Sequence, residues 1–270
     1  MQVLYDSSEK RLVCYRKKSD NAFWDIHWSK EDILRSHNSM SKYNLVIRVT
    51  KKYIHPDDGP ILEGGCGVGQ FVYLLSEGGY ECIGIDTAEK TIKRVQRTNP
   101  SLNLKIMDVR DLKFPDNYLA GYWSMGVIEH FFHGYNDILN EMHRVVKPGG
   151  YLFVTVPVMS VLRRVKAYFG FYERVNNSVQ NDLNKSAFYQ FILPHEKIIN
   201  DFKKKGLKFV EMRSKGGIKG LNDEIMIFKS LFRLISELRN KNIVFKSLSK
   251  LLEIILSPLA GHMKLFVFRK

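Results

Sequence analysis

The stretch ILEGGCGVGQF, residues 61–71, is a short apolar run that ends in an acid and four glycines. Glycine is costly to order, so this density indicates a backbone shaped around a ligand. The dinucleotide fingerprint G-x-G-x-x-G/A would need a glycine or alanine at 70 or 72, where the chain has Gln70 and Val72. Because Glu63 would also repel a pyrophosphate, the loop favours a ligand with an amine or a cationic centre.

Around this loop, apolar strand-like runs alternate with helical patterns. Strands are expected at 61–65, 80–86, 104–108, 119–128 and 151–157, and helices at 70–79, 88–99 and 137–146. Strands that are apolar throughout are typical of a parallel sheet covered on both faces. The pattern therefore predicts a doubly wound, mostly parallel α/β fold.

Three carboxylates recur at the ends of successive expected strands. Glu63, Asp86 and Asp108 are 23 and 22 residues apart, about one strand–helix unit each. Ligands of open α/β sheets bind beyond the carboxyl ends of the strands. At that edge Asp86 can accept from both hydroxyls of a ribose, and Asp108 can accept from an exocyclic amine such as that of adenine.

These segments carry a resemblance to a known family. ILEGGCGVG, CIGID, IMDVRDLKF, SMGVIEHF and VVKPGGYLFVTVP resemble, in order and spacing, the successive motifs of class I S-adenosylmethionine-dependent methyltransferases. The resemblance covers about residues 55–157, with weaker support in AFYQFILPHEKIINDFKKKGLKFVE. One departure is Gly64, where an aliphatic residue is more usual. The resemblance implies a Rossmann-like sheet of seven strands, with helical insertions after the fifth strand and near the C-terminus.

The resemblance also implies a cofactor, S-adenosyl-L-methionine, and the residues that hold it. The glycines would let the backbone approach the cofactor, and Glu63 would lie near its amino-acid part. Residues at the ends of the other strands would contact the ribose, the adenine and the methionine part. The implied cofactor set is Glu63, Gly65, Gly67, Gly69, Asp86, Asp108, Val109, Ser124, Met125 and Gly126.

The acceptor side is expected after the fourth strand. His130 is the first candidate for a general base, with Glu129 beside it as a second catalytic candidate. His133 and Tyr135 are expected to touch substrate. Only two ligand-type residues adjoin here, so no metal site is expected.

Other polar residues near these candidates are given structural roles. Asn136 and Asp137 are expected to cap the helix that follows them, and His195 to cap a helix or lie at the surface.

Four regions are expected along the chain. Residues 1–54 form an N-terminal helical cover, in which Trp24 and Trp28 share one helical face and either close over the cofactor or simply pack. Residues 55–157 form the cofactor-binding core, and 158–190 a substrate-side insertion. Residues 191–270 complete the catalytic domain and include a basic helical segment, 213–260. In that segment residues 228–238 and 248–255 have amphipathic patterns, which fit either packing on the domain or contact with a membrane.

Charge bears on partners and location. The formal net charge is +14, and residues 203–270 carry 16 Lys and Arg against 5 Asp and Glu. An acidic partner surface is therefore expected near the C-terminus, and peripheral contact of 213–260 with an acidic membrane is left open. Three widely spaced cysteines and the lack of a secretory signal indicate a cytoplasmic protein, with the inner membrane face as a further location.

The function expected is methyl transfer to a small-molecule or a sugar- or lipid-linked acceptor, with oxygen favoured as the acceptor atom. A nucleic-acid (RNA) methyltransferase is the first alternative, suggested by the charge but lacking an N/D-P-P-Y/F motif after the fourth strand. A membrane-associated, non-catalytic protein that keeps the fold is the second.

Overall fold

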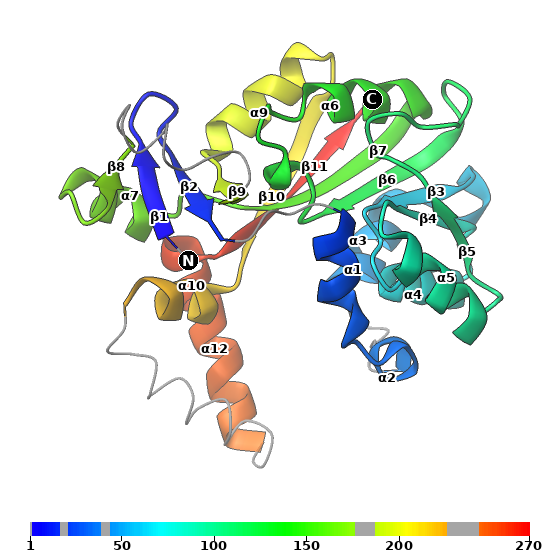
Figure 1. Ribbon diagram of the computed structural model, residues 1–270, viewed down its shortest axis with the longest axis horizontal. Coiled ribbons are helices and arrows are strands. Elements are labelled where there is room, and N and C mark those ends of the chain that lie inside the picture. The colour runs from blue at the N-terminus through cyan, green and yellow to red at the C-terminus, as the bar shows by residue number, and fades with distance from the viewer. Residues whose placement is uncertain (1, 17–20, 39–43, 176–186, 226–242) are drawn as a thin grey trace.

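The computed structural model describes residues 2–16, 21–38, 44–175, 187–225 and 243–270. Its main sheet has seven strands in the order β10-β11-β7-β6-β3-β4-β5 (Figure 1). Strands β3 to β7 run parallel, and only β11 runs against its neighbours within this sheet. The predicted doubly wound, mostly parallel fold is confirmed. The strands are β3 (Ile61–Gly64), β4 (Cys82–Asp86), β5 (Asn103–Ile106), β6 (Leu119–Met125), β7 (Val146–Pro157), β10 (Lys208–Lys215) and β11 (Met263–Arg269).

Helices cover both faces of this sheet because its strands are apolar on both sides. In β6, Tyr122 faces one core and the next residue, Trp123, faces the other. The Trp123 core is closed by α3 (Leu45–Tyr53), α4 (Gln70–Glu77) and α5 (Glu89–Thr98). The Tyr122 core is closed by α6 (Asn136–Val145) and α9 (His195–Lys204).

A second, four-stranded sheet lies beside the main one, in the order β8-β1-β2-β9. It joins an N-terminal hairpin to two strands that follow the core in sequence. These strands are β1 (Gln2–Asp6), β2 (Arg11–Tyr15), β8 (Glu173–Arg174) and β9 (Phe188–Ile192). In Figure 1 the hairpin and β8 stand at the left, away from β3, β4 and β5.

The hairpin corrects the expectation that residues 1–54 form a helical cover. Residues 2–6 and 11–15 are strands joined by a turn, and the helical cover begins at α1 (Asn21–Ser29) and continues in α2 (Ile33–Asn38). Asp6 shapes the hairpin turn, since its Oδ1 accepts from the backbone N–H groups of Ser8 and Glu9. Residues 12–15 are buried, and such short strands are stable only when a neighbour completes the sheet. Here β9 supplies that neighbour.

The segments outside the core contribute further helices. These are α7 (Val161–Tyr168), α10 (Gly217–Glu224) and α12 (Ile243–Ala260). Two short 3-10 turns, η1 (Pro56–Asp58) and η2 (Ile128–His130), lie within the core itself. In Figure 1, α12 projects to the same side of the sheet as α1 and α2. The expected amphipathic pattern at 228–238 lies outside the described residues. Within the described ranges, no helix has both the length and the apolarity to cross a membrane.

Candidate active site

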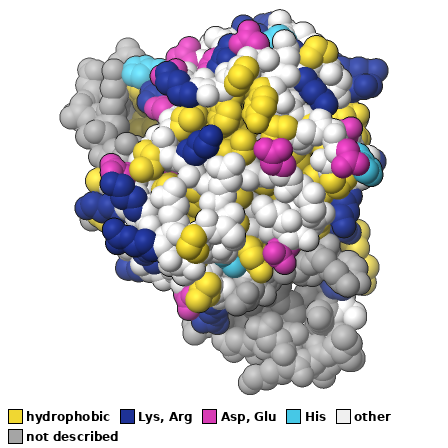
Figure 2. Space-filling view, turned by 90° about the vertical axis from the view of Figure 1, so that its right-hand side faces the viewer, with side chains coloured by type: hydrophobic (Ala, Val, Ile, Leu, Met, Phe, Trp, Pro, Cys, Tyr) yellow, Lys and Arg dark blue, Asp and Glu magenta, His cyan; other side chains and the backbone are white. Residues whose placement is uncertain are grey.

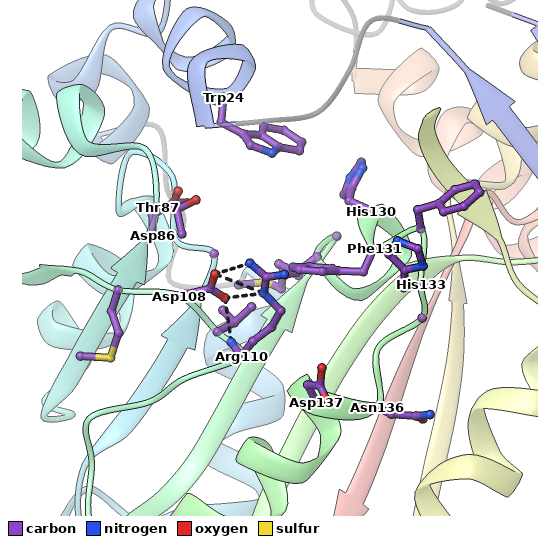
Figure 3. A pocket seen from close by; sticks show the side chains of 18 of the residues that line it. Trp24, Asp86, Thr87, Asp108, Arg110, His130, Phe131, His133, Asn136 and Asp137 are labelled. Atoms are coloured by element: carbon purple, nitrogen blue, oxygen red, sulfur yellow. Dashed lines mark hydrogen bonds and ion pairs between the residues drawn. The ribbon is translucent and has the colours of Figure 1, made fainter. Parts of the chain in front are cut away.

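A cavity of about 560 Å³ opens at the carboxyl edge of the main sheet, between α1 and the loop that follows β6. Figure 3 shows that its side chains come from separate parts of the chain and converge on one space. The lining residues are Trp24, Trp28, Gly65, Asp86, Thr87, Met107, Asp108, Val109, Arg110, Met125, Gly126, Val127, His130, Phe131, Phe132, His133, Gly134, Asn136 and Asp137.

The glycine loop approaches this cavity closely at two points. Gly65 has φ +75°, and a Cβ there would lie 2.5 Å from Cγ2 of Val127. Gly67 has φ +52°, and a Cβ there would lie 2.6 Å from the ring of Trp28. Both positions thus exclude a side chain by backbone conformation and by space. Of the three predicted glycines in this loop, only Gly65 lines the cavity, while Gly69 is the N-cap of α4.

Asp86 lies at the end of β4 and lines the cavity, as its predicted role requires. Its Oδ2 accepts from the backbone N–H of Gly67 at 2.8 Å, and its Oδ1 from that of Ala88 at 2.9 Å. Burial raises the pKa of this carboxyl, while these backbone hydrogen bonds oppose the shift. Asp86 therefore joins the glycine loop to β4 and keeps lone pairs for a further donor.

Asp108 also lines the cavity, but Arg110 already engages it. The Arg110 guanidinium and backbone N–H donate to both carboxylate oxygens, at distances from 2.6 to 3.2 Å. This ion pair lowers the pKa of Asp108. The guanidinium also lies 5.4 Å from the ring centroid of Phe131, so it is held between an acid and an aromatic face (Figure 3).

Two predicted cofactor residues are buried behind the cavity wall. Glu63 is 2% exposed, and burial raises the pKa of its carboxyl well above the usual range. Ser124 is 1% exposed at the end of β6. Within the described part of the chain, Glu63 Oε2 and Ser124 Oγ have no hydrogen-bond partner. The remaining predicted cofactor residues, Val109, Met125 and Gly126, line the cavity directly.

Helix α1 covers the cavity and is fastened to α5. Asp25 Oδ1 accepts from both the backbone N–H and the hydroxyl of Thr91, each at 2.9 Å. At the other end of α1, Arg94 donates to the backbone carbonyl of Trp28 at 2.6 Å. These contacts place both Trp24 and Trp28 in the cavity wall.

His130 lines the cavity with its tautomer set by a backbone group. Its Nδ1 lies 2.6 Å from the carbonyl oxygen of Tyr189, which can only accept, so Nδ1 carries the proton. The Nε2 lone pair is left as the acceptor. Burial lowers the pKa of the imidazole to about 4, so the ring is neutral at physiological pH. Trp24 packs edge-on against it, with centroids 4.9 Å apart.

Glu129, the second catalytic candidate, lies outside the cavity lining. It is 2% exposed, and burial raises the pKa of its carboxyl to about 8. Its Oε2 has no hydrogen-bond partner among the described residues. A protonated carboxyl beneath the loop after β6 fits a structural position better than contact with substrate.

Of the two predicted substrate residues, only His133 lines the cavity. Tyr135 is buried against the α6–α9 side, and its hydroxyl donates to Asp201 at 2.8 Å. The expected capping by Asn136 and Asp137 is wrong, since Tyr135 is the N-cap of α6 and no side chain caps it. Both residues line the cavity instead. His195 is the first residue of α9, where Arg164 donates to its Nδ1.

Sequence reasoning missed three contributors to this site. Arg110 and Phe131 stand inside the quoted motifs, but neither spacing nor residue type marked them as cavity walls. Tyr189 acts through its backbone carbonyl, which leaves no sequence signal at all. The fastening of α1 by Asp25 and Arg94 was equally invisible, because it joins residues more than 60 positions apart.

A family model described as a methyltransferase domain matches residues 62–154. The chain contains a methyltransferase domain. This confirms the predicted resemblance, and S-adenosylmethionine as the cofactor of the domain. A probable S-adenosylmethionine-dependent methyltransferase of Mycolicibacterium smegmatis is 30% identical over 97 residues, or 36% of this chain and 37% of that relative. The chain thus aligns with little more than a third of the length of this curated relative.

Solved structures resemble the methyltransferase domain and its flanking segments in fold. One is a chain from the complex between the Haloferax volcanii Trm112 methyltransferase activator and the putative methyltransferase. It has a TM-score of 0.56 and 14% identity, over 91% of this chain and 96% of that one. A second is an S-adenosylmethionine-dependent methyltransferase from Methanosarcina mazei, with a TM-score of 0.54 and 15% identity, over 82% and 96%.

Proposed function

We propose that the protein is an S-adenosylmethionine-dependent methyltransferase that acts on a small-molecule or a sugar- or lipid-linked acceptor, with oxygen as the favoured acceptor atom. One observation carries this proposal. The glycine loop at Gly65, the acids Asp86 and Asp108, and His130 surround a single cavity that two tryptophans cover.

The residues at this edge of the sheet fit the cofactor chemically. Asp86 retains lone pairs for ribose hydroxyls, and Val109 lines the end of the cavity where adenine would lie. Behind the cavity wall, Glu63 Oε2 has no hydrogen-bond partner among the described residues, and a carboxylate oxygen suits the ammonium group of an amino acid. The close contacts at Gly65 and Gly67 leave the backbone itself as the wall.

S-adenosylmethionine, when bound, supplies a methyl group already activated on a sulfonium. The chain must then align the acceptor and exclude water, and alignment alone can lower a barrier by about 7–11 kcal/mol. Trp24 and Trp28 of α1 cover the cavity and exclude water from that side. His130 presents the Nε2 lone pair, which can accept the proton that an acceptor hydroxyl loses.

The charges of the cavity bear on the acceptor class. Three carboxylates line it, Asp86, Asp108 and Asp137, against one guanidinium, Arg110. Such a lining repels a polyanion, which weakens the RNA alternative in spite of the net charge of +14. On the described part of the face in Figure 2, basic and acidic side chains are interspersed without a continuous basic stripe.

The membrane component of the proposal rests on α12. Leu251, Ile254 and Ile255 of this helix are each more than half exposed. With the basic C-terminal region, such a helix suits peripheral contact with an acidic membrane. A cytoplasmic location, at the inner membrane face when docked, is the matching proposal. A non-catalytic protein with the same fold would make the same membrane contact. A catalytic assay is therefore needed to distinguish it from a methyltransferase.

Calorimetric titration with S-adenosylmethionine tests the proposal. We expect saturable binding that Asp86→Ala weakens at least about tenfold, because hydrogen bonds to a charged group are lost. Asp111→Ala is the matched control, since Asp111 is exposed and, in the part of the chain that the structure describes, forms an ion pair only with Lys113. Failure of the native chain to bind would overturn the proposal. Production of S-adenosylhomocysteine across phenols, sugars, lipids and tRNA then assigns the acceptor, and flotation with acidic vesicles tests membrane contact.

A further inference from the structure

The Arg110 guanidinium and backbone N–H donate to both oxygens of the Asp108 carboxylate. The backbone N–H of Arg110 donates to Oδ1 at 2.8 Å, and Nε donates to Oδ1 at 3.0 Å and to Oδ2 at 3.2 Å. Nη2 donates to Oδ2 at 2.6 Å. A carboxylate has about four lone-pair sites. The three N–H groups, with Nε–H shared between both oxygens, hold both oxygens, so an adenine amine must compete with the guanidinium for Asp108.

We propose that Arg110 is an internal competitor for the adenine subsite, and that the cofactor binds Asp108 by displacing it. This proposal rests on the proposed function, since it takes S-adenosylmethionine as the ligand. Arg110 acts as a specificity-determining residue here, because it sets what an incoming base must replace.

Displacing the Arg110 guanidinium from Asp108 costs little free energy. The Arg110 and Asp108 side chains are 53% and 33% exposed, so their ion pair is screened by solvent. Only the side-chain contacts need to break, because the backbone N–H of Arg110 keeps its hydrogen bond to Oδ1. The remaining lone pairs then suit one exocyclic amine.

The displaced Arg110 guanidinium can pair with a second carboxylate, that of Asp137. Asp137 lines the same cavity and is near enough to raise the pKa of Arg110 together with Asp108. In Figure 3, Asp137 comes from the start of α6, on the side of the cavity where Phe131 and His133 lie. Cofactor binding would thus shift a positive charge from the adenine end toward the acceptor end.

The first test compares cofactor affinity in Arg110→Met with that in the native chain, by calorimetry. We expect the variant to bind S-adenosylmethionine about two- to fivefold more tightly, because an exposed ion pair no longer has to open. Lys113→Met is the matched control. It breaks the Lys113–Asp111 pair, which has the same spacing in the same loop but lies outside the cavity lining. Equal or weaker binding by Arg110→Met would overturn the proposal.

The second test uses a ligand without the amine. S-inosylhomocysteine carries a carbonyl oxygen where S-adenosylhomocysteine carries the exocyclic amine, and Arg110 can donate to that oxygen. We expect Arg110→Met to tighten binding of the adenine ligand and weaken binding of the inosine ligand. A general structural effect would move both affinities in the same direction and would exclude the competitor role.

A third measurement tests where the guanidinium goes. We expect Asp137→Asn to weaken S-adenosylmethionine binding in the native chain and to have no effect in the Arg110→Met background. An equal effect in both backgrounds would contradict the transfer to Asp137. If the native chain and all variants fail to bind any adenine ligand, the proposed function fails and not this inference alone.

Discussion

The hydroxyl of Tyr122 lies where a side chain at position 64 would have to be. A Cβ built on Gly64 would stand 2.0 Å from Tyr122 Oη and 2.7 Å from Cζ. Leu62 and Tyr122 are partners in register between β3 and β6, which brings the ring alongside Gly64. The departure from the family pattern at Gly64 is therefore matched by a large residue on the neighbouring strand.

Gly64→Ala should destabilise the fold through this contact. We expect a loss of about 1–3 kcal/mol in the free energy of unfolding, measured in urea, because overpacking forces the ring to move. Tyr122→Phe should recover part of this loss in the double variant, since it removes the nearest atom. The recovery is only partial because the ring carbon remains close. Additive effects of the two changes would contradict the contact.

Loosening α1 should weaken cofactor binding without unfolding the protein. Asp25→Ala removes two hydrogen bonds to Thr91, and Arg94→Met removes the contact with the Trp28 carbonyl. Each change should raise the Kd for S-adenosylmethionine severalfold, because the tryptophans are no longer held over the cavity. Glu89→Gln on α5 is the control, because among the described residues Glu89 forms its ion pair only with Lys93. A matching loss of affinity in the control would refute the fastening role.

The buried carboxyl of Glu129 should make stability depend on pH. Its pKa is about 8 in the folded chain and about 4.5 when unfolded, so the folded state holds the proton longer as pH rises. The stabilisation of the folded state that this raised pKa gives is fully present below pH 4.5 and is lost as pH rises toward 8. Glu129→Gln cannot ionise. We compare the free energy of unfolding in urea of the variant with that of the native chain. The difference between them should be about 2–4 kcal/mol more in favour of the variant at pH 8 than at pH 5. Parallel pH curves would count against a buried, protonated Glu129.

His130 should support turnover without titrating near neutrality. Since burial lowers its pKa to about 4, the imidazole stays neutral as pH falls from 8 to 5. We expect His130→Asn to lower kcat about 100-fold or more with a hydroxyl acceptor. The native pH–rate profile should show no acid limb near 6.5. An acid limb at that pH that disappears in His130→Asn would contradict the buried, neutral state.

Tyr135→Phe separates a structural tyrosine from a substrate contact. The hydroxyl donates to Asp201 on α9, away from the cavity lining. We expect the variant to lose about 1 kcal/mol in the free energy of unfolding while KM and kcat are unchanged. A raised KM at unchanged stability would restore the substrate role predicted from sequence.

The sequence was most informative where local pattern and burial coincide. The alternation of apolar strands and helices between residues 61 and 157 predicted the parallel sheet, and the regular spacing of Glu63, Asp86 and Asp108 predicted their common edge. The same spacing did not separate the two aspartates that line the cavity from Glu63, which is buried behind it. Depth beneath a surface depends on packing of the whole domain, which a strand pattern does not encode.

Prediction failed where an element depends on distant partners. Strand β2 is five residues long and lies beside a basic run, so no local pattern distinguishes it from a loop. Its partner β9 lies more than 170 residues away. Tyr135 was assigned to substrate because it follows His133 in one loop, but the backbone turns between them. Loop residues that are close in sequence can face opposite sides of the loop. The side that Tyr135 faces is set by its tertiary contact with Asp201.

The second sheet limits how this protein can be recombined with others. The carbonyl of Tyr189, on β9, sets the tautomer of His130, and β9 is paired with the N-terminal hairpin. Grafting residues 62–154 alone would therefore carry over the cofactor half and leave the histidine without its hydrogen-bond partner. A chimera that is meant to keep this acceptor chemistry would need the hairpin, β9 and the core from one parent.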